Sequence, residues 1–290
     1  MSMKQVQLSV IIPVYKVGQT LDRCVESVLR QQVPGDMEVI LVDDGSPDDC
    51  PQMCDAWARR DGRIRVVHQD NRGLGGARNA GLDICRGAYV TFADSDDFLA
   101  ANTYQPLMQR LAEHPEVDVM EYEFCMMKDD TRNQFLEDAV YRDARQYWMQ
   151  TRAWWHSYAW NKIFRRECFE EVRFADRIFC EDMHLLVRLL EKGPVVATAH
   201  LGTYYYIWNE AGLSASPSAE KIRQLLETQM YAWRALRMTT FSPGAPDFLR
   251  SMLYRQTDLY QASGEVLLRW PFVRLICWLH GKLAAHRRKD

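Results

Sequence analysis

The feature that most constrains the fold is a regular alternation of apolar runs and helical patterns over the first 130 residues. Four runs are rich in Val, Ile and other apolar residues: LSVIIPVY (8–15), MEVILVDDGS (37–46), IRVVHQ (64–69) and AYVTFAD (88–94). Such runs are typical of strands buried on both faces. Stretches such as 20–32 lie between them and carry apolar residues at helical spacing. The short links predict an α/β fold with a mostly parallel central sheet flanked by helices.

Polar residues stand at the carboxyl ends of three of these strands. They are PVY (13–15), DDGS (43–46) and DSDD (94–97). The carboxyl ends of parallel strands meet at one edge of a sheet, and ligands of such sheets bind beyond that edge. The sequence therefore predicts a polar site there.

Composition narrows the class of protein. The chain has 290 residues, 47% of them hydrophobic, which is enough for a sizeable core. Its net charge of −3 gives no basic field, so we expect no nucleic-acid partner. No secretory signal pattern is visible, and no apolar run reaches the roughly 18–20 residues that a membrane span needs. We therefore expect a cytoplasmic location, with the inner face of the cell membrane as a further option, and reduced cysteines.

Three aspartates close together are the clearest candidate for a chemical site. Strand geometry would place Asp94 and Asp96 on one face. Two carboxylates aimed at one cleft are unfavourable unless they are protonated or bridged by a cation. A hard divalent ion, Mg²⁺ or Mn²⁺, prefers such oxygen ligands. The alternative is that these residues cap the following turn and helix, which is the role we expect for Asp97.

A series of motifs in one order extends this interpretation. They are SVIIPVYKVGQTLDRCVESVLRQQ, EVILVDDGSPDD, NRGLGGARNAGLDICRGAYVTFADSDDF, AWNKIFRRECF, FCEDMHLLVRLL and YYYIWNEAGLS. Together they closely resemble the inverting family 2 glycosyltransferases of the GT-A (Rossmann-like) fold, over roughly residues 7–215. The resemblance implies a catalytic domain at 1–215, divided into a nucleotide-sugar-binding half (1–130) and an acceptor-binding half (131–215). A helical extension would follow at 216–290.

The resemblance also implies roles for the residues at the strand ends. Asp96 would bind the metal, Mn²⁺ or Mg²⁺, and Asp94 the ribose or the metal. Asp44 would accept a hydrogen bond from the uracil ring. The other expected nucleotide-sugar-binding residues are Pro13, Val14, Tyr15, Asp43, Arg78 and Ser95. For Asp43 and Asp44, a turn and helix-capping pair remains the alternative.

Residues around Arg78 and later in the chain receive further roles from the resemblance. Glycines 73, 75 and 76 would let the backbone approach the ligand. Asp182 would act as the base that deprotonates the acceptor hydroxyl, with Glu181 as support or alternate. The alternative is that both acids only favour a helix N-terminus. Trp160 and Asn161 are tentative acceptor-binding residues.

The implied activity is metal-dependent transfer of a sugar from a nucleotide sugar, expected to be a UDP-sugar. The acceptor would be a hydroxyl of a glycan or a lipid-linked saccharide in surface polysaccharide biosynthesis. Two alternatives remain: a non-catalytic nucleotide-sugar-binding scaffold, and a Mg²⁺-dependent phosphatase of the haloacid-dehalogenase type. In such phosphatases the D-x-D motif follows the first strand, whereas here it follows the fourth.

The tail, residues 265–290, combines Trp, Leu and Ile with Arg and Lys. That combination suits a membrane interface and indicates peripheral membrane contact. The basic residues do not form one polar stripe, so packing of the tail on the catalytic domain is the alternative.

Overall fold

The computed structural model describes residues 6–127, 133–134, 136–209, 218–271 and 273–277. Four parallel strands form one half of the central sheet, in the spatial order β3 (Ile64–His68), β2 (Asp36–Asp43), β1 (Val6–Val14) and β4 (Tyr89–Phe92). These are the four predicted apolar runs. Their parallel arrangement confirms the predicted fold class.

The sheet continues beyond β4 with later parts of the chain. The order there is β9 (Lys162–Arg165), β6 (Val119–Met126), β10 (Val196–Tyr206) and β5 (Phe98–Leu99). Strand β9 runs antiparallel to both β4 and β6, whereas β6 and β10 are parallel. Two short strands, β7 (Asn133–Gln134) and β8 (Ala139–Tyr141), pair with β6 and β10.

Helices cover both faces of the sheet. On one face lie α1 (Leu21–Leu29), α2 (Cys50–Arg60) and α4 (Tyr104–Glu113), and on the other α3 (Gly73–Ile84), α5 (Ala144–Gln150) and α6 (Glu181–Leu190). Strand β1 contributes side chains to both faces. Leu8, Val10 and Ile12 pack on the side of α1, and Ile11 packs on the side of α3. Two 3₁₀ turns, η1 (Ala153–Trp155) and η2 (Arg166–Phe169), flank β9.

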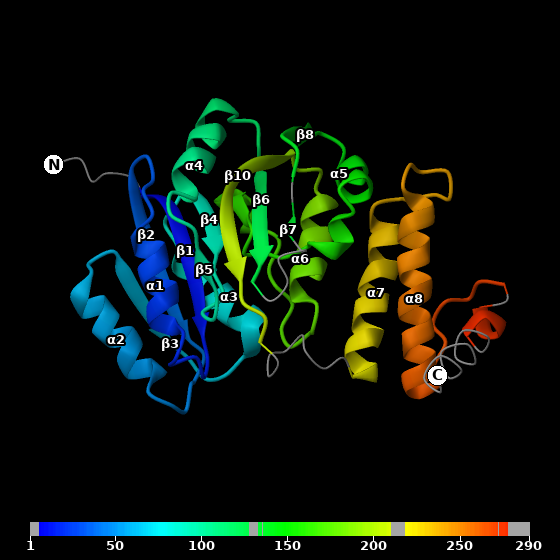
Figure 1. The fold of residues 1–290 in the computed structure, drawn as a ribbon, viewed down its shortest axis with the longest axis horizontal. Helices are drawn as coiled ribbons and strands as arrows, with labels where there is room; N and C mark the ends of the chain where they lie inside the picture. Colours follow the sequence, from blue (N-terminus) through cyan, green and yellow to red (C-terminus); the bar gives the residue numbers. More distant parts are fainter. Residues whose placement is uncertain (1–5, 128–132, 135, 210–217, 272, 278–290) are drawn as a thin grey trace.

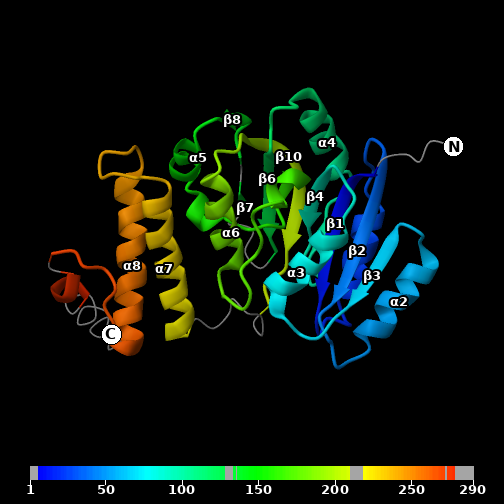
Figure 2. The ribbon, with the colours of Figure 1, turned by 180° about the vertical axis from the view of Figure 1, so that it is seen from behind.

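Two long helices extend the molecule beside α6 (Figures 1 and 2). They are α7 (Ala219–Ala235) and α8 (Ala245–Ser263), and residues 236–244 separate them. Phe248 of α8 meets the ring of Trp148 from α5 with centroids 5.7 Å apart. The core is thus continuous between the sheet and these helices. The expected boundary at 215/216 falls outside the described residues.

Candidate active site

The residues that carry the predicted chemistry meet around one arginine. Arg78, on α3, has no exposed surface. Its Nη2 donates to Oδ1 of Asp94 at 2.8 Å, and its Nη1 donates to Oε1 of Glu181 at 3.0 Å and to Oδ1 of Asp182. Its guanidinium also lies against the ring of Phe174, 5.2 Å from the centroid. One buried cation therefore gathers three carboxylates from two distant parts of the sequence.

This arrangement alters the acidity of Arg78, Glu181 and Asp182. Burial alone would lower the pKa of Arg78, but the carboxylates of Asp182, Asp94 and Glu181 raise it above the ordinary value. Burial raises the pKa of Glu181 and of Asp182, and Arg78 only partly opposes the rise. A carboxylate with a raised pKa is a better proton acceptor near neutral pH than an exposed one.

Asp182 is held by both of its oxygens. Oδ1 accepts from Arg78, and Oδ2 accepts from the backbone N–H of Ala159 at 3.0 Å. Glu181 and Asp182 also occupy the first turn of α6, where acids favour the helix dipole. The two acids thus lie at a helix N-terminus, as the alternative describes, and they also bind Arg78.

The D-x-D segment is a turn rather than a strand. Strand β4 ends at Phe92, and the N–H of Asp97 donates to the carbonyl of Asp94 at 3.0 Å. Asp94 and Asp96 therefore do not share a strand face. Asp94 turns toward Arg78, whereas Asp96 lines a cavity of about 520 Å³ together with Asp48, Asp49, Met53, Asn209 and residues 16–20.

The electrostatics of this turn fit a cation at Asp96. Burial and the neighbouring Asp94 raise the pKa of Asp96 to about 6. A desolvated carboxylate that lines a cavity is stabilised in its charged form by a bound divalent ion. Asp94 has one oxygen engaged by Arg78. Within the described ranges, no group of three or more His, Cys, Asp or Glu residues could hold a metal ion.

Asp97 has a separate, internal role. It is 1% exposed and accepts from the N–H of Ile207 at 2.7 Å and from the hydroxyl of Tyr204 at 2.9 Å. Burial, with Asp94 and Asp96, raises its pKa to about 9. The residue ties the turn to the end of β10, in agreement with the structural role expected for it.

The other expected nucleotide-binding residues lie at the ends of β1, β2 and β4. Pro13, Val14 and Ser95 are buried, while Tyr15 is 42% exposed. Asp44 is 3% exposed and accepts from the N–H groups of Arg72 and Gly73, both at 2.8 Å, and from Gln69.

Asp43, the neighbour of Asp44, is also 3% exposed and accepts from the N–H of Ser46 at 2.9 Å. Asp43 thus shapes the turn after β2 and Asp44 the entry to α3, as the turn and capping alternative describes. Their contact with a nucleotide stays a prediction.

The glycines before Arg78 face the protein at two of three positions. A Cβ on Gly75 would lie 2.6 Å from the carbonyl oxygen of Ala175, and one on Gly76 would lie 2.5 Å from Cβ of Arg72. Only Gly73, with a φ of +80°, meets open space. At Gly75 and Gly76 the close approach is therefore between α3 and other residues of the protein. This corrects the expectation that all three glycines let the backbone approach the ligand.

The tentative acceptor residues are also internal. Trp160 is 2% exposed and stacks on Tyr158 and Tyr204, with centroids 4.6 and 4.3 Å apart. Asn161 has no exposed surface and donates to Glu121 and to the carbonyl of Tyr122. Arg78, expected to bind the nucleotide sugar, is likewise enclosed. Trp160, Asn161 and Arg78 therefore do not present their side chains to a ligand in this structure, because other residues of the protein cover them.

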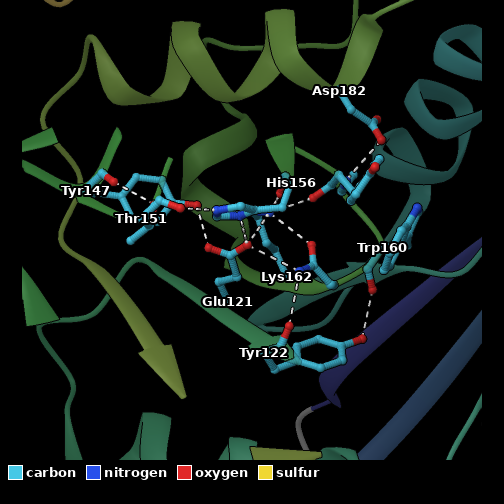
Figure 3. A network of polar contacts seen from close by, with 11 residues as sticks. Glu121, Tyr122, Tyr147, Thr151, His156, Trp160, Lys162 and Asp182 are labelled. Carbon is cyan, nitrogen blue, oxygen red and sulfur yellow. Dashed lines mark hydrogen bonds and ion pairs between the residues drawn. The ribbon is translucent and has the colours of Figure 1, made fainter. Parts of the chain in front are cut away.

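A buried polar cluster around Glu121 was not predicted (Figure 3). Glu121 lies within β6, has no exposed surface, and contacts Tyr147, His156 and Lys162. The signal in the sequence is an acid in the middle of the apolar run VDVMEYEF (117–124). Since a buried charge needs a partner, that acid predicts a nearby cation.

Comparison with known proteins places this architecture in a family. The sequence model described as "Glycosyl transferase family 2" matches residues 9–173. The uncharacterized glycosyltransferase EpsJ of Bacillus subtilis is 32% identical over 237 residues, which cover 78% of this chain and 68% of that protein. Glycosyltransferase GlyG of Streptococcus pneumoniae is 42% identical over 107 residues, 37% of this chain and 35% of that protein.

Solved structures share the fold. S. aureus TarS (residues 1–349) in complex with UDP-GlcNAc superposes with a TM-score of 0.66 at 21% identity, covering 89% of this chain and 81% of that chain. Mannosyltransferase PcManGT from Pyrobaculum calidifontis, in complex with GDP-Man and Mn²⁺, gives 0.61 at 18% identity, covering 97% and 81%. The chain belongs to glycosyl transferase family 2 and is a glycosyltransferase of the GT-A fold, which confirms the predicted family and removes the phosphatase alternative.

Proposed function

We propose that this glycosyltransferase moves a sugar from a UDP-sugar, with a divalent ion, to a hydroxyl of a glycan or lipid-linked saccharide in surface polysaccharide biosynthesis. The observation that carries the proposal is the convergence of Asp94, Glu181 and Asp182 on Arg78, next to the cavity that Asp96 lines. Residues 1–215 form the catalytic domain in this proposal, and 216–290 form a helical extension.

The proposed chemistry assigns a task to three of these carboxylates. Asp96 holds the ion, which when bound offsets the charge that develops on the diphosphate leaving group. Asp182 accepts the proton of the acceptor hydroxyl as the oxygen attacks the anomeric carbon. The nucleoside diphosphate leaves from the opposite side, so a single displacement inverts the configuration at that carbon. Glu181 shares Arg78 with Asp182 and keeps a second carboxylate beside the base.

Solved structures of the same fold support the choice of a UDP-sugar, through TarS, and of a divalent ion, through PcManGT. TarS has been solved with UDP-GlcNAc, and PcManGT with GDP-Man and Mn²⁺. A further relative, the minor teichoic acid biosynthesis protein GgaB of Bacillus subtilis, is 23% identical over 84% of this chain. The raised pKa of Asp96, caused mainly by burial, supports a cation at that residue.

Release of UDP from UDP-GlcNAc in the presence of Mn²⁺ tests the proposal. A thermal-shift screen with UDP-, GDP- and dTDP-sugars selects the donor first. Removing the ion with EDTA, or replacing Asp96 or Asp182 by Asn, should reduce release by at least about 10³-fold, the order expected for loss of a key catalytic group. Asp83→Asn provides the matched control, because it makes the same change on an exposed residue of α3.

The outcomes separate the alternatives. A non-catalytic scaffold would bind the donor, shift the melting temperature and release no UDP. Full activity of both the Asp96 and the Asp182 variants would refute the proposed roles.

A further inference from the structure

The buried cluster around Glu121 lies behind the site and takes no part in the chemistry proposed above. Figure 3 shows Glu121 facing Tyr147, His156 and Lys162, with Asp182 nearby. Glu121 accepts from the Tyr147 hydroxyl at 2.7 Å, and it lies 2.6 Å from Nδ1 of His156 and 3.1 Å from Nζ of Lys162. Glu121 and Lys162 have no exposed surface. An ion pair buried as deeply as that of Glu121 and Lys162 seldom adds to the stability of a fold. The positions that the pair gives to its neighbours are therefore a better guide to its role.

Lys162 ties together one turn of the chain. Besides Glu121, its Nζ donates to the carbonyl oxygens of His156 and Tyr158 and to Oδ1 of Asn161, each at 2.9 Å. These acceptors precede Lys162 by one to six residues. The ammonium group therefore fixes the path of the segment between η1 and β9.

One of these acceptors connects Lys162 to Asp182. The carbonyl of Tyr158 and the N–H of Ala159 belong to the same peptide unit. The described chain has no cis peptide bond, so this C=O and N–H point in opposite directions. The C=O accepts from Lys162, and the N–H donates to Oδ2 of Asp182 at 3.0 Å. A hydrogen bond on the carbonyl also polarises the N–H and strengthens the bond on the other side.

We propose that Lys162 is a positioning residue for Asp182, acting through the peptide unit between Tyr158 and Ala159. With Arg78 on Oδ1 and the Ala159 N–H on Oδ2, the carboxylate is held in a single orientation toward the acceptor. Glu121 balances the charge of Lys162, so that the lysine can be buried without a direct contact to Asp182. The inference rests on the proposed function, in which Asp182 is the base.

The charged groups around Asp182 set the direction of the expected effect. Arg78 on α3 and Lys162 on β9 are the cations, and Asp94 after β4 and Glu181 on the same helix are the anions. Burial raises the pKa of Asp182, while Arg78, the Ala159 N–H and Lys162 lower it. Without Lys162, the charged form of Asp182 loses one cation and a well-aimed donor. The group should then ionise only at higher pH.

The double variant Glu121→Gln, Lys162→Met tests the link without leaving a lone buried charge. At pH 7 we expect kcat for UDP release from UDP-GlcNAc with Mn²⁺ to fall by about 10²-fold, the order reported for small misplacements of a reacting group. The KM for the donor should be unchanged, and the acid limb of the kcat profile should move to higher pH. Tyr147→Phe is the matched control, because it removes a donor to Glu121 without touching the peptide unit. Its acid limb should stay in place.

A second variant and a second measurement complete the test. Ala159→Pro removes the N–H that Asp182 accepts while Lys162 stays in place, and should shift the limb in the same direction. Titration of the Asp182 carboxyl by ¹³C NMR in the ligand-free protein reports the link without any turnover. An unshifted carboxyl titration in either folded variant would overturn the inference. A wild-type enzyme that releases no UDP would instead refute the proposed function, and the NMR titration would still decide the role of Lys162.

Discussion

At the scale of single residues, Arg78 is the organising group of the site. The resemblance predicts that it binds the donor, whereas in the structure its guanidinium is enclosed by Asp94, Glu181, Asp182 and two aromatic rings. The three acids come from a turn after β4 and from the first turn of α6. A buried arginine is suited to this task, because its planar fork can hold several carboxylates at once.

Replacing Arg78 by Met should be strongly destabilising. Three carboxylates would remain in a buried site without their cation, and loss of one partner of a buried ion pair lowers the free energy of unfolding by about 3–5 kcal/mol. The loss should be smaller at pH 5 than at pH 7, because protonation removes the unpaired charges. Urea denaturation of wild type and variant at both pH values measures it. Arg78→Lys keeps the charge and should lose less, and an equal loss at the two pH values would contradict the explanation.

The sequence predicts which residues meet but not how they point. The strand ends place Asp44, Asp94 and Asp96 at one edge, because the carboxyl ends of parallel strands meet there. Orientation depends on contacts across about a hundred residues, such as Tyr204 with Asp97. The pairing of Arg78 with Glu181 and Asp182 is of this kind, and no local pattern encodes it.

At the scale of elements, the strands and helices of the first half follow the predicted pattern closely, since each carries its own periodicity. The place of β9 does not follow from that pattern. Its residues, 162–165, insert antiparallel between β4 and β6, although β4 ends some seventy residues earlier. Strand neighbours that are distant in sequence are fixed by the whole sheet, and that information is not in the run itself.

At the edge of the sheet opposite the site, Glu38 joins three elements. It lies in β2, is 2% exposed, and accepts from the Ser9 hydroxyl of β1 at 2.7 Å and from the Arg86 N–H before β4 at 2.6 Å. Burial alone would raise the pKa of Glu38, but these hydrogen bonds and those from the side chains of Arg86 and Arg65 lower it below the ordinary value.

The variant Glu38→Gln should therefore be less stable at neutral pH by about 1–3 kcal/mol, the usual effect of disrupting a buried hydrogen-bonded group. A lowered pKa stabilises the fold above the unfolded-state pKa of about 4.3, and this contribution is lost as the pH falls through the folded-state value. The difference between variant and wild type should shrink accordingly between pH 6 and pH 3. Guanidinium denaturation across that range is the measurement, with exposed Glu26→Gln as control. A constant difference would contradict the assignment to this ionisation.

At the scale of the whole molecule, α7 and α8 complete the core that begins on the sheet. Leu226 and Phe248 lie in the same apolar cluster as Trp148, Trp154 and Leu185. None of the helices in the described ranges is both long and apolar enough to cross a membrane. The predicted membrane contact concerns the segment that follows α8.

That segment has two faces. Leu268, Val273 and Cys277 are buried in the main core, in agreement with the packing alternative. Trp270, Leu275 and Ile276 are 37%, 51% and 38% exposed. Arg269 and Arg274 are exposed between them. Phe272 and residues 278–290, which also belong to the predicted membrane-contacting tail, lie outside the described residues. The exposed face combines apolar and basic side chains as an interfacial segment does.

Deletion of the tail would not test membrane contact alone, because it would also remove Leu268, Val273 and Cys277 from the core. Substitutions on the exposed face avoid this. Replacing Trp270, Leu275 and Ile276 by Gln changes only the exposed face. If this face contacts the membrane, flotation with phosphatidylcholine vesicles containing phosphatidylglycerol should decrease several-fold in the triple variant, while its melting temperature stays close to that of the wild type. Vesicles of phosphatidylcholine alone should bind the wild type less, since Arg269 and Arg274 would lose the anionic lipid. Equal flotation of variant and wild type would show that the exposed face does not hold the protein to the bilayer, and the segment would then act only by packing on the core.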